Sequence, residues 1–198
     1  MVYIIDSCFH WVGFHLVQHL LTEGKEVIGI DQVETSKREN LYFYIGRNSR
    51  FQHFHSLKEM DRHCHQEHTE AAIRIEDSNR EAAGGFGAIL LCESVEALME
   101  EKGERLDLPP LYGEWMPRDE SFAYIGREPI LFNELFQRKD ASYIEDFLAR
   151  FLTKLTERGI SAVKEVYRME QLADTSDREK IYSQLQNHYQ RHQQFYED

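Results

Sequence analysis

The hydrophobic pattern of the first thirty-one residues constrains the fold more than any other feature of the chain. Residues 2–5 form a short apolar run, which is typical of a buried strand. Apolar residues then recur at helical spacing over residues 12–21, and Gly24 follows where a helix would end. A second apolar run over residues 26–30 is closed by Asp31. A strand, a helix and a strand in this space predict a βαβ unit with a right-handed crossover and parallel strands.

The rest of the chain predicts fewer strands and several helices. A third strand is expected within residues 50–57, and a helix or loose connection over the polar residues 58–83. Further elements are expected as follows: a helix ending near Gly103, a Pro-rich loop over 106–120, a strand or short helix over 129–136, an amphipathic helix over 141–159, a short strand over 161–169, and a helical tail from Asp177. We predict one domain over residues 1–198, with the loop and the C-terminal helices inside residues 104–198.

Composition narrows the class of protein. The chain has 198 residues and a net charge of −12, which disfavours a nucleic-acid binder and docking on an anionic membrane. No apolar run approaches the roughly 18 residues of a membrane span, and the N-terminus lacks the features of a signal peptide. Three widely spaced cysteines favour a reduced, cytoplasmic setting.

The turn between the first strand and the helix has the position of a phosphate-binding glycine turn, but only one of its glycines. Such a turn needs glycine for a tight bend, for close approach to pyrophosphate, and for helix–strand packing. These positions fall on Ser7, His10 and Gly13. Asp31 stands where an acidic residue would hold ribose hydroxyls. The His10 imidazole would occupy the space of a pyrophosphate, so two readings remain open: a weakened cofactor site, or a βαβ unit that binds nothing.

Several stretches in the same order resemble the extended short-chain dehydrogenase/reductase family of NAD-dependent nucleotide-sugar epimerases and dehydratases. They are "SCFHWVGFHLVQHLLTEGKEVIGID", "NSRFQHFHSLKEMD", "LPPLYGEWMPRDE", "RKDASYIEDFLARFLTKLTE" and "SAVKEVYRM". The resemblance implies an α/β fold with a Rossmann-like parallel sheet. Because the interval before the "YGE" loop is short, we expect a sheet truncated in the middle, with a small C-terminal appendage of helices and a strand.

The resemblance also implies a catalytic Tyr-x-x-x-Lys pair, which this chain lacks between residues 60 and 110. Aligning Glu96 with the family's helix glutamate places Ala88 and Cys92 at the Tyr and Lys positions. Without a tyrosine of lowered pKa, hydride transfer has no acid–base partner. We therefore predict no catalytic residue and no required cofactor, although NAD or NADP binding stays possible.

Three basic residues are candidates for binding an anionic ligand. Lys139 stands where the family places an arginine that contacts the diphosphate of a nucleotide sugar, and Arg138 is adjacent. Arg118 follows the Tyr112-Gly113 loop. The alternative is that these three are ordinary surface charges.

A histidine-rich stretch over residues 53–68 offers imidazole and thiolate groups, which are good zinc ligands. The candidates for a metal are His63, Cys64, His65 and His68, because helical spacing would place several of them on one face. The alternative is a solvated polar segment.

Three hypotheses follow. The leading one is a non-catalytic epimerase/dehydratase homologue that binds a nucleotide-type ligand, such as a nucleotide sugar, or a protein partner. We expect it to form a homo-oligomer, because a shortened sheet leaves edges uncovered. The second is an active NAD-dependent epimerase or reductase in which Tyr112 or Tyr143 serves as the acid. The third is a metal-binding protein.

Overall fold

A computed structural model describes residues 2–64, 69–76, 87–125, 128–160, 163 and 175–196. Packing contacts divide the chain into two compact units. The first unit contains residues 1–76 and 88–106, and the second contains residues 77–87 and 107–198. The expectation of a single domain over residues 1–198 stays a prediction.

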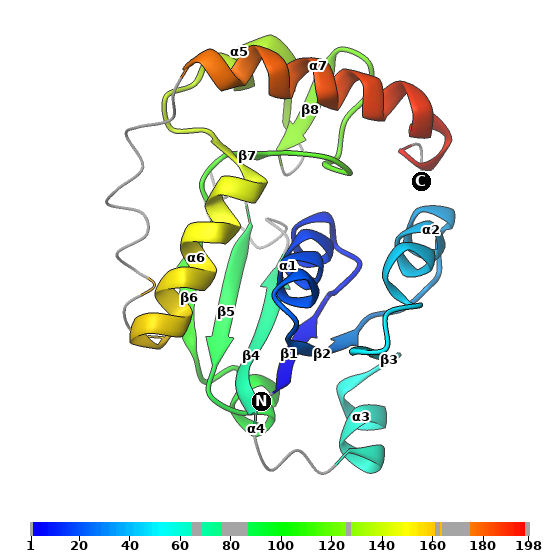
Figure 1. Ribbon diagram of the computed structural model, residues 1–198, viewed down its shortest axis with the longest axis vertical. Coiled ribbons are helices and arrows are strands. Elements are labelled where there is room, and N and C mark those ends of the chain that lie inside the picture. Colours follow the sequence, from blue (N-terminus) through cyan, green and yellow to red (C-terminus); the bar gives the residue numbers. More distant parts are fainter. Residues whose placement is uncertain are drawn as a thin grey trace. The chain divides into compact units, whose positions relative to one another are not determined.

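The first unit is built on a six-stranded sheet with the order β3-β2-β1-β4-β5-β6 (Figure 1). The strands are β1 (Val2–Asp6), β2 (Glu26–Ile30), β3 (Phe51–Phe54), β4 (Thr69–Glu76), β5 (Ala88–Cys92) and β6 (Glu104–Asp107). Neighbours among the first four run parallel, and β5 runs antiparallel to β4. The order 3-2-1 is that of one half of a doubly wound nucleotide-binding sheet, and β4 lies where the second half of such a sheet begins. The predicted α/β fold with a Rossmann-like sheet is therefore confirmed.

Four helices accompany this sheet. They are α1 (Trp11–Thr22), α2 (Ser36–Ile45), α3 (Leu57–His63) and α4 (Val95–Met99). Thr35, Ser56 and Ser94 precede the last three, and each side chain accepts a hydrogen bond from a first-turn amide. These side chains satisfy helix amides that have no partner inside the helix, which fixes where each helix begins. The predictions of β1, α1, β2 and β3 are confirmed.

The core of the first unit fills both faces of the sheet. One face carries a buried cluster formed by the strands together with α3 and α4: Ile4, Ile28, Ile30, Phe54, Met60, Ala72, Leu90, Cys92, Val95 and Leu98. Successive strand residues point to opposite faces, so Tyr3, Ile5 and Val27 point the other way, and they are also buried. A strand covered on both faces reads as a continuous apolar run, which is why the sequence identifies β1 and β2.

The expectation of a helix or loose connection over residues 58–83 is wrong where β4 lies. This strand pairs with β1 at the centre of the sheet, yet its sequence is "TEAAIRIE". Its charged residues have partners: Arg74 pairs with Asp6, and Glu76 pairs with Arg105. These ion pairs allow charged residues within a central strand. The strand therefore lacks the continuous apolar run by which a buried strand is recognised in a sequence.

A second correction concerns residues 88–92, which the sequence places at the start of a helix. They form β5, and the helix that follows, α4, contains only residues 95–99. The alignment of Ala88 and Cys92 with a helical Tyr-x-x-x-Lys pair is therefore wrong. All five residues of β5 are buried, so the segment is an interior strand.

The second unit consists of short strands and longer helices. The strands are β7 (Leu111–Tyr112), parallel to β10 (Ser142–Tyr143), and β8 (Phe122–Ile125), antiparallel to β9 (Glu128–Leu131). The helices are α5 (Phe132–Gln137), α6 (Ile144–Arg158), α7 (Thr175–His192) and a 3-10 turn η2 (Gln193–Phe195). The predicted amphipathic helix is confirmed as α6 and the helical tail as α7. The strand predicted over 161–169 lies outside the described residues, apart from Val163.

Candidate functional site at the first strand–helix turn

The turn after β1 keeps the backbone path of a glycine turn without its first glycine. Ser7 has φ of 65°, a left-handed conformation that costs a non-glycine residue about 1–2 kcal/mol. The amides of Ser7 and Cys8 donate to the carbonyl oxygen of Ile30 at 2.8 and 3.3 Å. These bonds hold the turn against the end of β2, so the strained residue stays in place.

Gly13 is the packing glycine that the sequence predicts. A Cβ atom at this position would lie 2.3 Å from the carbonyl oxygen of Ser7, which is too close for any side chain. The helix α1 can approach the turn this closely only with glycine here. The predicted structural role of Gly13 follows directly from this distance.

His10 caps the amino end of α1. Its Nδ1 atom accepts a hydrogen bond from the amide of Val12 at 3.3 Å, and its own amide donates to the Ser7 carbonyl at 3.1 Å. A bound anion at a helix N-terminus uses the same first-turn amides. The imidazole therefore occupies one of the donors that a phosphate would need.

The Asp31 carboxylate is engaged by the chain itself. Its Oδ2 atom accepts from the amide of Phe9 at 2.9 Å. Its Oδ1 atom accepts from the amide of Gln32 at 2.8 Å and from Nη1 of Arg38 at 2.9 Å. Only 8% of the side chain is exposed, and burial raises the pKa of Asp31 against these hydrogen bonds. The carboxylate thereby ties the turn to the end of β2 and to α2. Binding of ribose hydroxyls by Asp31 stays a prediction.

Aromatic rings fill the space beside this carboxylate. Phe9 is buried, and its ring lies 5.1 Å from His53 and 6.0 Å from Tyr42. The Nε2 atom of His53 lies 2.9 Å from the Asp31 carbonyl oxygen, and burial lowers the pKa of His53. A neutral imidazole in this position extends the packing between β3 and the turn.

The histidine-rich stretch divides between β3, α3 and residues outside the described part of the chain. Nδ1 of His63 lies 3.1 Å from the Glu59 carbonyl oxygen, and the Cys64 thiol donates to Gln52 at 3.9 Å. His65 and His68 lie outside the described residues. Within the described ranges no group of three potential metal ligands occurs, and metal binding stays a prediction.

An ion-pair network joins the carboxyl ends of β1 and β4, where the strand order reverses. Nε of Arg74 lies 2.6 Å from the Asp6 carboxylate, and Nη1 of the same residue lies 3.2 Å from Glu101. Ligands of open α/β sheets bind in the crevice at this reversal point. Sequence reasoning missed the network, although an acidic residue directly after a buried strand was a usable signal for Asp6.

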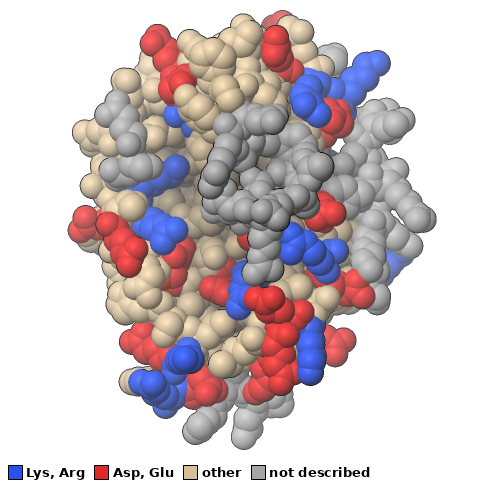
Figure 2. All heavy atoms as spheres, turned by 180° about the vertical axis from the view of Figure 1, so that it is seen from behind, with Lys and Arg blue, Asp and Glu red and all other residues tan. Residues whose placement is uncertain are grey.

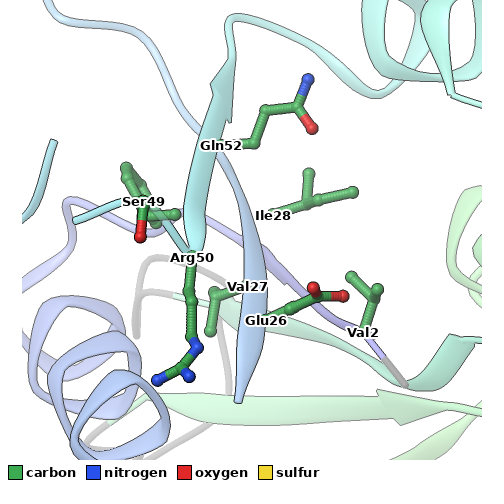
Figure 3. Close-up of a pocket in the computed structure, with 8 residues that line it drawn as sticks. Val2, Glu26, Val27, Ile28, Ser49, Arg50 and Gln52 are labelled. Carbon is green, nitrogen blue, oxygen red and sulfur yellow. The ribbon is translucent and has the colours of Figure 1, made fainter. Parts of the chain in front are cut away.

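At the opposite ends of the strands, the sheet carries a hollow of about 220 Å³ (Figure 3). It lies at the amino ends of β1, β2 and β3 and is lined by Val2, Glu26, Val27, Ile28, Ser49, Arg50, Phe51 and Gln52. None of the predicted site residues lines it. On the face shown in Figure 2, acidic and basic side chains are interspersed.

The predicted anion-binding residues belong to the second unit, and the two arginines among them have partners within the chain. The Arg118 guanidinium is buried between the rings of Phe132 and Tyr189, at 4.1 and 4.5 Å, and donates to Gln186 at 3.0 Å. Burial lowers the pKa of Arg118.

Arg138 forms two hydrogen bonds to Asp140, at 2.9 and 2.6 Å. Lys139 is exposed. An anion would have to compete with Asp140 for Arg138, whereas Nη1 of Arg118 is buried without a hydrogen-bond partner in the described part of the chain. Binding of an anion at these residues stays a prediction.

Tyr112 and Tyr143 stack on each other with ring centroids 5.8 Å apart. Burial raises the pKa of Tyr112, and burial together with Glu145 and Glu114 raises the pKa of Tyr143 to about 12. A tyrosine that exchanges protons near neutral pH needs a lowered pKa. The environment of both rings acts in the opposite direction.

The strand order and the turn define the class as a Rossmann-like α/β protein. No family model and no curated protein matches the sequence. Among solved structures the chain is similar to the yeast methylglyoxal/isovaleraldehyde reductase Gre2 complexed with NADPH, with 27% identity and a TM-score of 0.26. The match covers 31% of this chain and 19% of the reductase chain. The assignment of the fold class therefore uses the sheet topology and not this match. No helix among the described residues could span a membrane.

Proposed function

We propose that this protein is a non-catalytic Rossmann-type protein that acts by binding, and that its partner is another protein chain. The observation that supports the non-catalytic part of the proposal is the Asp31 carboxylate, whose two oxygens accept from three donors of its own chain. A dinucleotide in the usual position would have to compete with these donors for Asp31 and displace the His10 cap. Such a ligand would therefore bind at a cost that glycine turns avoid.

The enzyme hypothesis finds little support in the tyrosines that it requires. Tyr112 is 1% exposed, and the pKa values of Tyr112 and Tyr143 are both raised. The sequence also contains no tyrosine followed four residues later by lysine. Hydride transfer to or from a hydroxyl would thus lack a proton acceptor that works at neutral pH.

The surface of α2 supports a protein partner. Phe43 and Tyr44 are adjacent on this helix, and 59% and 54% of their surfaces are exposed. Exposed aromatic side chains are enriched at protein–protein interfaces. In keeping with the predicted homo-oligomer, we propose a second copy of this chain as the first partner to test.

A second candidate function is the binding of a phosphorylated dinucleotide such as NADP, and Arg38 favours it. In sheets of this kind, an arginine near the end of β2 donates hydrogen bonds to the ribose 2′-phosphate of NADP. Here Arg38 lies 2.9 Å from Asp31, and its side chain is 36% exposed. A 2′-phosphate could take Arg38 from this pair.

The deciding experiment measures the thermal midpoint of the full-length chain with NAD, NADP, UDP-glucose and AMP. A ligand at 100 times its dissociation constant stabilises the folded state by about 2.7 kcal/mol. We expect NAD and UDP-glucose to shift the midpoint no more than AMP does. A saturable shift with NAD, accompanied by hydride exchange with a nucleotide sugar, would overturn the proposal.

A shift with NADP alone that disappears in Arg38→Gln would establish the second candidate instead. For the partner, sedimentation equilibrium should show self-association that Phe43→Ser weakens. The matched control is Met99→Ser, because Met99 is also exposed, at 46%, but lies on α4. A monomeric chain at all concentrations would contradict the proposed self-association.

A further inference from the structure

The second unit contains a hollow of about 450 Å³ between α5 and α7. Its lining combines two aromatic rings, two amides and two charged groups: Asn133, Phe136, Gln137, Arg178, Glu179 and Tyr182. This volume lies within the range of small-molecule sites, roughly 300–1,000 Å³. None of these residues belongs to the turn described above, so the inference does not depend on the proposed function.

Arg178 is anchored on one side only. Its Nη1 atom donates to the carbonyl oxygens of Phe136 at 2.9 Å and Arg138 at 3.3 Å, at the carboxyl end of α5. Its Nε atom is buried and has no hydrogen-bond partner within the described part of the chain. Buried donors in folded proteins are nearly always paired, so this atom calls for a partner.

The geometry of the Arg178 guanidinium indicates which chemical group of a ligand could bind to it. Nε and Nη2 present two roughly parallel N–H groups on one edge, which match the two oxygens of a carboxylate. The contacts to the α5 carbonyls use Nη1, so they hold the group in place without using this edge. A single guanidinium beside Glu179 suits one negative charge better than two.

The aromatic rings that line the hollow indicate what kind of body the ligand should have. Phe136 and Tyr182 meet edge to face, with centroids 5.5 Å apart and an interplanar angle of 74°. Phe132 also packs on Tyr182, with ring centroids 5.5 Å apart, and Tyr112 packs on Phe136 at 4.6 Å. The rings of Phe136 and Tyr182 are therefore held in place by two further rings. Rings held in this way offer a rigid apolar wall for a planar body.

We propose that this hollow binds a small aromatic carboxylate, with its carboxylate on the Nε and Nη2 edge of Arg178 and its ring against Phe136 and Tyr182. Asn133 and Gln137 are four residues apart on α5 and therefore share a face, where their amides can contact polar substituents of the ring. The competing explanation is that Arg178 only caps α5, in which case the hollow has no affinity for anions.

The test is an NMR titration of the full-length chain with benzoate, neutral benzamide and phenyl phosphate. We expect saturable benzoate binding, at least about tenfold tighter than benzamide, because the charged two-point contact is lost in the amide. Equal affinity for benzoate and benzamide, or no benzoate binding, would overturn the proposal. Tighter binding of phenyl phosphate would reject the carboxylate as the preferred head group.

Variants separate the site from the helix cap. Arg178→Gln should abolish benzoate binding, but it also removes contacts to α5. Asn133→Asp is the decisive variant, because Asn133 is exposed and the change places a carboxylate at the rim without touching the cap. We expect it to weaken benzoate about fivefold and leave benzamide unchanged. The control Arg150→Gln, at an exposed position of α6, should alter neither; an unchanged benzoate affinity in Asn133→Asp would refute the site.

Discussion

Replacing Asp31 tests whether its carboxylate serves the fold or a ligand. In Asp31→Ala, the buried Phe9 amide loses its acceptor, which costs about 1–3 kcal/mol. The pair with Arg38 adds about 0–1 kcal/mol, since that arginine is 36% exposed and screened by solvent. We therefore expect a loss of about 2 kcal/mol and, for a chain of this length, a midpoint lower by about 4–8 °C.

Asp31→Asn is the matched control. The amide oxygen can still accept from Phe9. The amide nitrogen cannot accept from Gln32 and Arg38, but the variant has no charge to bury, so its stability should stay within about 1 kcal/mol of the parent chain. Circular dichroism during thermal and urea unfolding measures both variants. An unchanged midpoint in Asp31→Ala would refute the structural role of the carboxylate and leave it available for ribose hydroxyls.

The difference in stability between the parent chain and Asp31→Asn should depend on pH with a definite sign. Burial raises the pKa of Asp31 in the folded state above its unfolded value. The folded state therefore binds the proton more tightly, and the contribution of Asp31 to stability falls as pH rises from about 4 through the raised pKa. Compared with Asp31→Asn, the parent chain should lose stability over this window. A parent that gains stability there would contradict the assigned direction.

Three further predictions concern other sites. Gly13→Ala should lower the free energy of unfolding, measured by urea unfolding, by about 1–3 kcal/mol or more, because the new Cβ would lie 2.3 Å from the Ser7 carbonyl oxygen. Ser7→Gly should be neutral or stabilising by up to about 1 kcal/mol in urea unfolding, since relief of left-handed strain exceeds the entropy cost of glycine. Arg118→Gln should destabilise the chain by about 1–3 kcal/mol, because the cation–π contacts with Phe132 and Tyr189 are lost; a stable variant would mean that Arg118 is available to a ligand.

The sequence predicts those parts of the fold in which local pattern and tertiary environment agree. The strands β1 and β2 are buried on both faces and therefore read as apolar runs, and α6 buries six apolar residues on one stripe. The strand β4 was missed because its polar residues are accommodated by Asp6 and Arg105, which lie far away in the chain. A pattern of adjacent residues carries no information about such distant partners.

The same limit applies to the candidate site. Gly13 and Asp31 could be located from their spacing, since a βαβ turn fixes where a packing glycine and a strand-end acid fall. The partners of Asp31 could not, because Phe9 and Arg38 reach it only after the turn and α2 have folded. Arg178 escaped notice for a similar reason: in sequence it belongs to a polar tail, and only the fold brings it to the carboxyl end of α5.

The contacts of the first turn show that a Rossmann-like turn can be held in place by groups of its own chain. In a glycine turn that binds a dinucleotide, the ligand takes up the turn amides and the strand-end acid. In this chain the Phe9 amide goes to Asp31, the Val12 amide goes to His10, and Ser7 holds the bend at a cost. The contacts of Asp31 and His10 stabilise the turn with no ligand bound, whereas the left-handed conformation of Ser7 strains it. Cofactor binding at the turn stays a prediction, and the recognition sites that we propose lie on α2 and in the hollow at Arg178.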